Sequence, residues 1–253
     1  MATFDLAAEY LDLLKRCLTR EVFPDEHWDL TLSNRLPFDR ALREVGRDWP
    51  TEALTMVGLK RLNNLQDCVV RAIQDRVPGD LMETGVWRGG CAILMRAVLA
   101  VYGEPQRSVW LADSFRGLPL PDAAAYPADL LDRHSTLAPY LGVALDTVRD
   151  NLRRFGFLDS QVRFLEGWFR DTLPTAPVEK IAVLRLDGDM YESTYVAISS
   201  LYPKVSVGGF VIVDDYGALP NCRLAIEDYR AQQGITEQIH EVDWTGVYWR
   251  KER

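Results

Sequence analysis

Several residue types and patterns that define common protein classes are scarce in this sequence. Its 253 residues include three histidines and four cysteines. No two cysteines form the Cys-x-x-Cys pair that is typical of zinc sites and redox centres. Neither a zinc site nor a disulfide framework is therefore expected. The cysteines are interpreted as buried free thiols: Cys17, Cys68, Cys91 and Cys222.

Long apolar runs are also missing. No stretch approaches the roughly 20 consecutive apolar residues that a membrane-spanning helix needs. Residues 1–16 carry acids at helical spacing, where a signal peptide would carry basic residues and an apolar run. We therefore expect a cytoplasmic protein that does not interact with a membrane.

Positive charge is in the minority, because 29 Lys and Arg residues face 37 Asp and Glu residues, for a formal net charge of -8. No Lys/Arg run is long enough to form a local basic stripe, so a nucleic-acid partner is not expected. Apolar residues, at 47%, suffice for one large core. The length favours one α/β domain over residues 51–253, with an N-terminal helix and arm over residues 1–50.

The N-terminal part of the chain predicts two helices separated by an arm. Between residues 4 and 18, apolar side chains recur at steps of three and four, as on an amphipathic helix. Residues 20–50 are rich in Arg, Asp, Trp and Pro and have weak periodicity, which indicates an irregular arm, lid or oligomer contact. A second helix is predicted from Thr51, as its cap, to about Arg76.

From residue 80 onward, short apolar runs alternate with helical stretches, which is typical of a mostly parallel sheet with helices on both faces. Five runs are predicted to be buried strands: 80–84, 108–112, 162–165, 181–186 and 210–213. Four segments are predicted to be helices: 90–102, 143–156, 191–202 and 221–233. Runs 237–242 and 247–250 predict a final antiparallel hairpin. Segment 117–142, which is long for a connection, is interpreted as a lid.

A nucleoside cofactor is expected where the first two strands end. The first strand runs into Glu83-Thr84-Gly85-Val86-Trp87-Arg88-Gly89-Gly90, where glycines permit a tight turn and a helix N-terminus offers free N–H groups. The second ends at Asp113, whose carboxylate can accept hydrogen bonds from both ribose hydroxyls. Glu83 would repel a pyrophosphate but favour the ammonium group of a methionine moiety. A turn without a ligand, and an ion pair between Glu83 and a nearby Arg or Lys, are the alternatives.

Two further features refine the cofactor. The glycines at 85, 89 and 90 do not follow the Gly-x-Gly-x-x-Gly spacing of dehydrogenases. The third strand leads into Gly167-Trp168, where the indole can cover an adenine ring or simply pack in the core. These features favour S-adenosylmethionine (SAM) over a dinucleotide.

Acidic residues follow the fourth and fifth strands directly. Asp187 and Asp189 come after residue 186, and Asp214 and Asp215 come after residue 213. Because neighbouring parallel strands end at the same edge, these carboxylates should converge. They would repel one another unless a cation lay between them, and an all-oxygen set suits Mg²⁺. The sequence therefore predicts a magnesium site beside the cofactor.

A sulfonium methyl donor next to Mg²⁺ suggests O-methylation. The methyl donor needs no general acid, but an alcohol is a poor nucleophile, and a divalent ion held by two adjacent oxygens of a diol would lower the pKa of the hydroxyl. Asp187 or Asp189 is expected to take the proton, and the sequence does not separate ligand from base. His134 in the predicted lid is a rival base, whereas His240 in a predicted strand is interpreted as structural.

These motifs closely resemble those of the macrocin O-methyltransferases, which are Mg²⁺- and SAM-dependent enzymes that methylate deoxysugar hydroxyls of macrolide and aminocoumarin antibiotics. The resemblance covers about residues 4–18 and 50–250, and its motifs are the following: residues 55–65, residues 83–90, Ala112-Asp113-Ser114-Phe115, Gly167-Trp168-Phe169, Leu186-Asp187-Gly188-Asp189-x-Tyr191 and Asp214-Asp215-Tyr216.

The resemblance implies a Rossmann-like methyltransferase fold with a seven-stranded sheet, and a homodimer or larger oligomer. It also implies metal ligands at Asp187, Asp214 and Asp215. The implied cofactor site comprises Met56, Glu83, Thr84, Gly85, Val86, Asp113, Ser114, Gly167, Trp168 and Asp187.

The departures from the family lie where the acceptor would be chosen. Segments 20–47 and 117–142 look individual, and Arg35 stands where an acidic lid residue is expected. These departures leave the particular acceptor open but not the reaction type. From the diol chemistry and the resemblance, the expected acceptor is a vicinal diol on a glycosylated natural product or a related polyol. Two other functions are alternatives. A Mg²⁺ phosphohydrolase would need a nucleophilic Asp after the first strand, where this chain has Glu83, and a non-catalytic SAM-binding module would have lost the acids present here.

Overall fold

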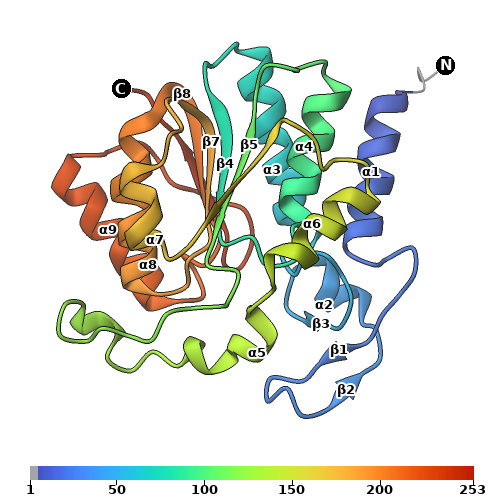
Figure 1. Ribbon diagram of the computed structural model, residues 1–253, viewed down its shortest axis with the longest axis horizontal. Helices are drawn as coiled ribbons and strands as arrows, with labels where there is room; N and C mark the ends of the chain where they lie inside the picture. Colours follow the sequence, from blue (N-terminus) through green and yellow to red (C-terminus); the bar gives the residue numbers. More distant parts are fainter. Residues whose placement is uncertain (1–4) are drawn as a thin grey trace.

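A seven-stranded sheet forms the centre of the computed structural model, which describes residues 5–253 (Figure 1). The strand order is β6-β5-β4-β7-β8-β10-β9. Strands β4 to β8 pair in parallel, and β10 pairs antiparallel with β8 and β9. The predicted α/β architecture and its C-terminal hairpin are confirmed. The strands have these bounds: β4 Asp80–Thr84, β5 Val109–Asp113, β6 Val162–Glu166, β7 Ile181–Leu186, β8 Val205–Val213, β9 His240–Glu241 and β10 Val247–Arg250.

The register of the central strands determines where a site can form. Thr84 in β4 lies opposite Leu186 in β7, and Leu186 lies opposite Val213 in β8. Each of these residues ends its strand. Asp187 and Asp214 therefore leave the sheet next to each other at its carboxyl edge, as the sequence predicted.

Helices cover both faces of the sheet (Figure 1). Because successive strand residues point to opposite faces, Leu81 and Val183 pack on one layer of helices, and Met82 and Leu184 pack on the other. Burying each such aliphatic side chain contributes about 1.5–3 kcal/mol. The first layer comprises α1 Leu6–Leu18, α3 Gly58–Gln74, α4 Gly90–Val101 and α6 Leu145–Arg154, and the second comprises α7 Phe169–Thr172, α8 Tyr191–Leu201 and α9 Pro220–Gln233.

The segment predicted to be an irregular arm is instead organised. It contains a three-stranded antiparallel sheet and a short helix: β1 His27–Trp28, β2 Arg35–Leu36, β3 Trp49–Pro50 and α2 Arg40–Glu44. Its centre is the fully buried Arg43, which donates to Asp25 Oδ1 at 2.7 Å and to Asp48 Oδ2 at 2.6 Å. Ion pairs rather than apolar periodicity hold this arm together, so hydrophobic spacing did not predict it.

The second helix begins later than predicted. It starts at Gly58, and Thr51 does not cap it, because the Thr51 hydroxyl donates to the Glu26 carbonyl oxygen at 3.0 Å. The Leu54 N–H also donates to the Leu18 carbonyl oxygen at 2.9 Å. These long-range hydrogen bonds hold residues 51–57 outside the helix, where Met56 reaches the pocket described below.

Two other elements begin more than two residues away from their predicted starts. Strand β8 begins at Val205, five residues before the predicted start at 210, because Gly208 and Gly209 interrupt the apolar pattern without ending the strand. The first hairpin strand spans two residues, His240–Glu241, rather than 237–242.

The segment interpreted as a lid contains short helical turns: η1 Pro127–Asp129, η2 His134–Leu137 and α5 Ala138–Leu141. The fully buried Asp129 attaches it to the start of α8. Its two carboxylate oxygens accept the backbone N–H groups of Tyr191 at 2.8 Å and Glu192 at 2.9 Å. This contact caps free donors of the helix and fixes the segment next to Asp189.

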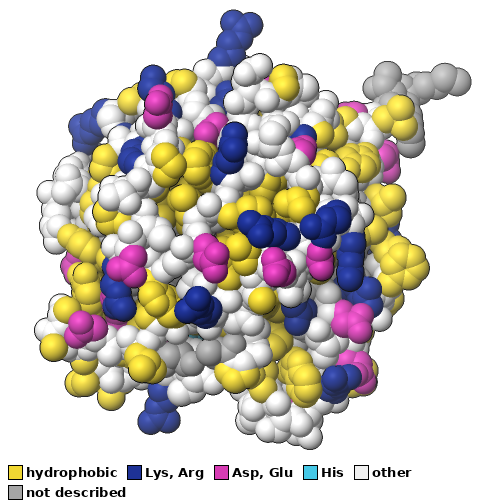
Figure 2. Space-filling model, viewed as in Figure 1, with side chains coloured by type: hydrophobic (Ala, Val, Ile, Leu, Met, Phe, Trp, Pro, Cys, Tyr) yellow, Lys and Arg dark blue, Asp and Glu magenta, His cyan; other side chains and the backbone are white. Residues whose placement is uncertain are grey.

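The charge distribution on the surface, the helices and the cysteines agree with the expectations from composition. Figure 2 shows basic and acidic side chains interspersed on the face that it presents. Across residues 5–253, no helix has both the length and the apolar character needed to cross a bilayer. The cysteines are free, and Cys17 is half-buried while the other three are buried.

Candidate active site

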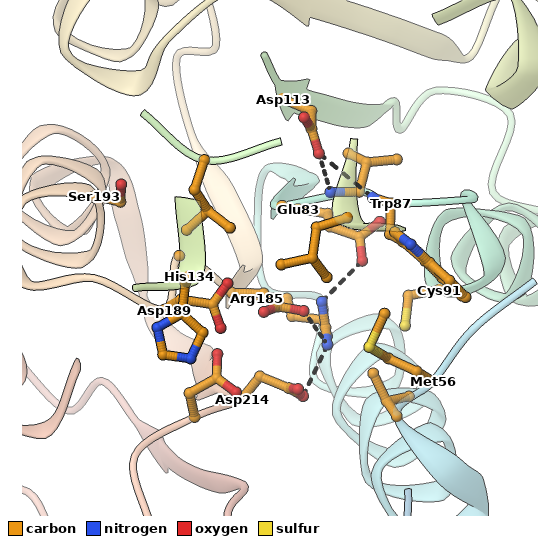
Figure 3. Close-up of a pocket in the computed structure, with 18 of the residues that line it drawn as sticks. Met56, Glu83, Trp87, Cys91, Asp113, His134, Arg185, Asp189, Ser193 and Asp214 are labelled. Carbon is orange, nitrogen blue, oxygen red and sulfur yellow. Dashed lines mark hydrogen bonds and ion pairs between the residues drawn. The ribbon is translucent and has the colours of Figure 1, made fainter. Parts of the chain in front are cut away.

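A pocket opens at the carboxyl edge of the sheet, where β4, β5, β7 and β8 end. Figure 3 shows Glu83, Trp87 and Asp113 toward one end of it, and His134, Asp189 and Asp214 toward the other. We refer to these as the cofactor end and the acidic end. Most of the predicted cofactor residues line the pocket: Met56, Glu83, Gly85, Val86, Asp113, Ser114, Trp168 and Asp187. Thr84 and Gly167 are not among the lining residues.

Glycine is required at the turn after β4. Gly85 has a φ of +84°, and a Cβ built there would lie 1.9 Å from the Asp187 carbonyl oxygen. A Cβ at Gly90 would lie 2.5 Å from the Leu54 carbonyl oxygen. The turn can therefore pack directly against Asp187 and the segment before α3 only because these side chains are absent.

Glu83 lies fully buried beneath the cofactor end. Its Oε1 pairs with Arg185 Nη1 at 3.0 Å, so the ion pair that the sequence left as an alternative is present. Its Oε2 has no hydrogen-bond partner in the described chain. Burial raises the pKa of Glu83 to about 8, against the opposing effect of Arg185. Oε2 is therefore available to a cationic ligand, whose charge would favour the ionised carboxylate.

Asp113 organises the cofactor end. Its Oδ2 accepts the Val86 N–H and its Oδ1 accepts the Phe115 N–H, each at 2.7 Å. Burial raises the pKa of Asp113, although these backbone donors oppose the shift. The carboxylate thus holds the glycine-rich turn against β5 while lining the pocket, and its remaining lone pairs can accept hydroxyl groups.

The acidic residues converge as predicted. One carboxylate oxygen from each of Asp187, Asp214 and Asp215 lies within 4.8 Å of the others. Burial and neighbouring carboxylates raise the pKa of Asp215 well above its usual range, and Asp215 Oδ2 has no hydrogen-bond partner in the described chain. Burial also raises the pKa of Asp187, against Arg185. Carboxylates brought together in this way repel one another, and an added positive charge would relieve that repulsion.

Sequence reasoning missed two arginines that partly supply this charge. Arg185 Nη2 lies 2.9 Å from Asp187 Oδ2 and 2.8 Å from Asp214 Oδ1, and Arg61 pairs with Asp214 and Asp243. Burial alone would raise the pKa of Asp214, but the two guanidinium groups outweigh it and lower that pKa. Arginine side chains therefore offset part of the acidic charge, whereas the argument from the sequence considered only a bound cation. Arg185 could have been recognised as the one charged residue in an otherwise apolar strand.

Negative charge still exceeds positive charge around this edge. The lining includes three arginines, Arg61, Arg170 and Arg185, against eight acidic residues: Asp48, Glu83, Asp113, Asp187, Asp189, Glu192, Asp214 and Asp215. The excess suits cationic ligands such as a sulfonium, an ammonium group or a divalent metal ion.

Asp189 and His134 lie next to each other at the acidic end (Figure 3). Burial and Asp187 raise the pKa of Asp189 to about 7, against the opposing effect of His134. The His134 ring is held by Asp132, whose Oδ2 lies 2.9 Å from Nδ1. The three candidate bases Asp187, Asp189 and His134 all line the pocket. His240, which was interpreted as structural, is exposed in β9 and is not a lining residue.

Comparison with known proteins identifies the family. The model of the macrocin O-methyltransferase (TylF) family matches residues 7–251. A tetracenomycin rhamnosyl 4'-O-methyltransferase of Streptomyces olivaceus is 52% identical over 98% of this chain and 94% of its own length. Demethyldecarbamoylnovobiocin O-methyltransferase of Streptomyces niveus and mycinamicin III 3''-O-methyltransferase of Micromonospora griseorubida are each 49% identical over 96% of this chain, covering 94% and 96% of their own lengths.

Solved structures agree with this assignment. The O-methyltransferase NovP superposes with a TM-score of 0.93 at 46% identity, covering 98% of this chain and all of NovP. The calicheamicin methyltransferase CalS11, at 20% identity, has a TM-score of 0.61 over 96% of this chain and 91% of its own, and it shares the fold. The alternatives of a phosphohydrolase and a non-catalytic module are not supported. The chain belongs to the macrocin O-methyltransferase family and is an O-methyltransferase that uses SAM.

Proposed function

We propose that this enzyme methylates one hydroxyl of a vicinal diol on a sugar of a glycosylated natural product, with Mg²⁺ as a second cofactor. The observation that carries the proposal is that the acidic cluster and the cofactor end share one pocket. A methyl donor bound at one end and a hydroxyl held at the other would meet between them.

Each part of SAM has a suitable partner at the cofactor end of the pocket. The free Oε2 of Glu83 would accept the ammonium group of the methionine moiety. Asp113 would accept the ribose hydroxyls, and the Trp168 ring, which lines the pocket, would cover the adenine. Met56 reaches the same pocket from the segment before α3.

The donor set fits magnesium. Asp187, Asp214 and Asp215 offer three carboxylate oxygens within 4.8 Å of one another, and hard divalent ions prefer such ligands. The unpartnered buried Oδ2 of Asp215 supports this assignment. When bound, the ion would lower the pKa of the acceptor hydroxyl and orient it.

Asp189 is the base that we favour. It lines the pocket beside the cluster without belonging to the three clustered ligands, so its carboxylate is left to accept a proton. The acceptor oxygen forms a bond to the methyl carbon, the carbon–sulfur bond breaks, and the hydroxyl proton passes to Asp189. His134 is the alternative base, since Asp132 orients its ring toward the same end of the pocket.

The names of the relatives support the acceptor class. One is named as the 4'-O-methyltransferase of a rhamnosyl-tetracenomycin C, and others are named for demethyldecarbamoylnovobiocin and mycinamicin III. The divergent segments 20–47 and 117–142 contribute Gly46, Leu118 and His134 to the pocket, and these segments would select the particular acceptor.

The proposed assembly is a cytoplasmic homodimer or larger oligomer. The outer face of α1 leaves Leu6, Tyr10 and Leu13 exposed at 73%, 43% and 51%, which suits burial against another copy. Light scattering of the purified protein would test the oligomeric state.

A screen tests the acceptor class. Incubating the enzyme with SAM, Mg²⁺ and glycosylated natural products, together with the matched aglycones, should give a mass gain of one methyl group in the glycosides that carry a free diol. Methylation of the aglycones alone would contradict a sugar acceptor.

A further inference from the structure

The strand order arranges the pocket from one side to the other. Asp113 ends β5, Glu83 lies in β4, Asp187 follows β7, and Asp214 follows β8. The next strand is β10, which is preceded by Trp244. From β4 to β10 there are three strand spacings, or about 14 Å. Trp244 therefore lies beyond the acidic cluster, on the side away from the cofactor end.

Trp244 differs from the other tryptophans that line the pocket. Trp49 and Trp87 pack on Tyr140, with ring centroids 5.0 Å and 5.6 Å apart. Trp168 is half-buried. Trp244 instead remains 40% exposed while lining the pocket. A partly exposed aromatic side chain on a residue that lines a pocket leaves apolar surface that a ligand can cover.

The indole is held in place by hydrogen bonds around it. Its Nε1 donates to the Val45 carbonyl oxygen of the arm at 2.8 Å. The adjacent Thr245 hydroxyl donates to the Asp214 carbonyl oxygen at 3.0 Å, and the Gly217 N–H donates to the Thr245 carbonyl oxygen at 2.8 Å. The Arg47 guanidinium lies over the ring, 4.7 Å from its centroid. Trp244 is therefore fixed relative to the loop that carries the acidic cluster.

We infer that Trp244 is a specificity-determining residue on which the sugar ring of the acceptor packs. This inference rests on the proposed sugar acceptor. A pyranose ring has an apolar face of C–H groups, which an indole can cover at little entropic cost because the indole is already fixed. A sugar packed there has its hydroxyls next to Asp214 and Asp215, and the aglycone extends toward the open side of the pocket.

Two substitutions distinguish the contribution of the aromatic ring from that of its Nε1 hydrogen bond. Trp244→Ala removes both, whereas Trp244→Phe removes the Nε1 donor and keeps an aromatic surface. Tyr102→Ala is the matched control, because Tyr102 is 41% exposed and does not line the pocket. Steady-state kinetics would be measured with the glycosides methylated by the wild type, and SAM affinity would be measured by calorimetry.

For Trp244→Ala we expect the KM of the glycoside to rise about tenfold or more, as for loss of an aromatic anchor, with SAM affinity unchanged. Trp244→Phe should keep most of the affinity, and Tyr102→Ala should match the wild type. An unchanged KM in Trp244→Ala, or an equal loss of SAM affinity, would overturn the inference while leaving the proposed function intact. A wild type that methylates non-sugar diols but no glycoside overturns both.

Discussion

Glu83 and Arg185 form a buried ion pair, with Oε1 and Nη1 3.0 Å apart, and this pair joins the two ends of the active site. The same guanidinium contacts Asp187 and Asp214 through Nη2. Arg185 therefore contacts one carboxylate at the cofactor end of the pocket and two in the acidic cluster. It also leaves Oε2 of Glu83 without a partner in the described chain.

Replacing Glu83 should weaken cofactor binding. Glu83→Gln keeps the shape and an oxygen that Arg185 can contact, but it removes the negative charge offered to the ammonium group of SAM. We expect the Kd for SAM to rise about tenfold or more, the effect of losing a charge-assisted hydrogen bond. Calorimetry with SAM measures this directly, and an unchanged Kd would show that Glu83 serves only as the partner of Arg185.

Substitutions at Asp189 and His134 should distinguish the two candidate bases. Asp189→Asn should lower kcat by about 100-fold or more, as expected for loss of a general base, with little change in SAM affinity. His134→Gln should have a clearly smaller effect on kcat. The two variants would be compared in single-turnover experiments. If His134→Gln instead shows the larger loss, His134 is the base and Asp189 only supports it.

Gly85→Ala should destabilise the protein far more than a glycine-to-alanine change at a position with open space around it. The new methyl group would lie 1.9 Å from the Asp187 carbonyl oxygen. Gly103→Ala is the matched control, since Gly103 has a φ of +68° and a Cβ added there would meet nothing within 4 Å. We expect the free energy of unfolding to fall by about 1 kcal/mol in the control, because of left-handed backbone strain, and by more than about 3 kcal/mol in Gly85→Ala. Urea unfolding measures both values. Equal losses would mean that the close approach has no energetic consequence.

The ion pairs of the arm should make stability depend on pH. Burial would raise the pKa of Asp25, but hydrogen bonds from Arg43 and from backbone N–H groups outweigh it and lower that pKa. A lowered folded-state pKa means that the stabilisation is present above the unfolded-state value near 3.8 and is lost as the pH falls through the folded-state value.

The substitution that tests this pH dependence is Asp25→Asn. It should cost about 3 kcal/mol near neutral pH, because it leaves the buried Arg43 short of a counter-charge. The difference from the wild type should begin to shrink below about pH 4, where Asp25 takes up a proton in the unfolded chain, and should shrink further as the pH falls through the lower folded-state pKa. Urea unfolding at several pH values measures this, and a difference that stays constant down to pH 3 would count against the assignment.

The main features of the fold and site follow from local sequence signals. Apolar runs located the central strands, and acids immediately after residues 186 and 213 placed Asp187 and Asp214 at one edge. The rule that parallel strands end at a common edge makes that convergence independent of the details of packing.

The features that were missed depend on partners far away in the chain. Arg185 pairs with a residue 102 positions earlier, and Arg61 with one 153 positions later. Thr51 looks like a helix cap until its hydroxyl is seen to contact Glu26 instead. The arm packs around the buried Arg43, and no hydrophobic periodicity in the sequence marks an arm that is built around a charged residue. Tertiary ion pairs of this kind override local propensity. They join residues at irregular distances along the chain, so no periodic pattern in the sequence predicts them.

The claim that metal and methyl donor act in one pocket is tested most directly by metal removal. Enzyme treated with EDTA should bind SAM as tightly as before but should not methylate a glycoside acceptor, and added Mg²⁺ should restore turnover in the wild type but not in the Asp214→Asn, Asp215→Asn double variant. Full turnover by that double variant with EDTA present would contradict the account.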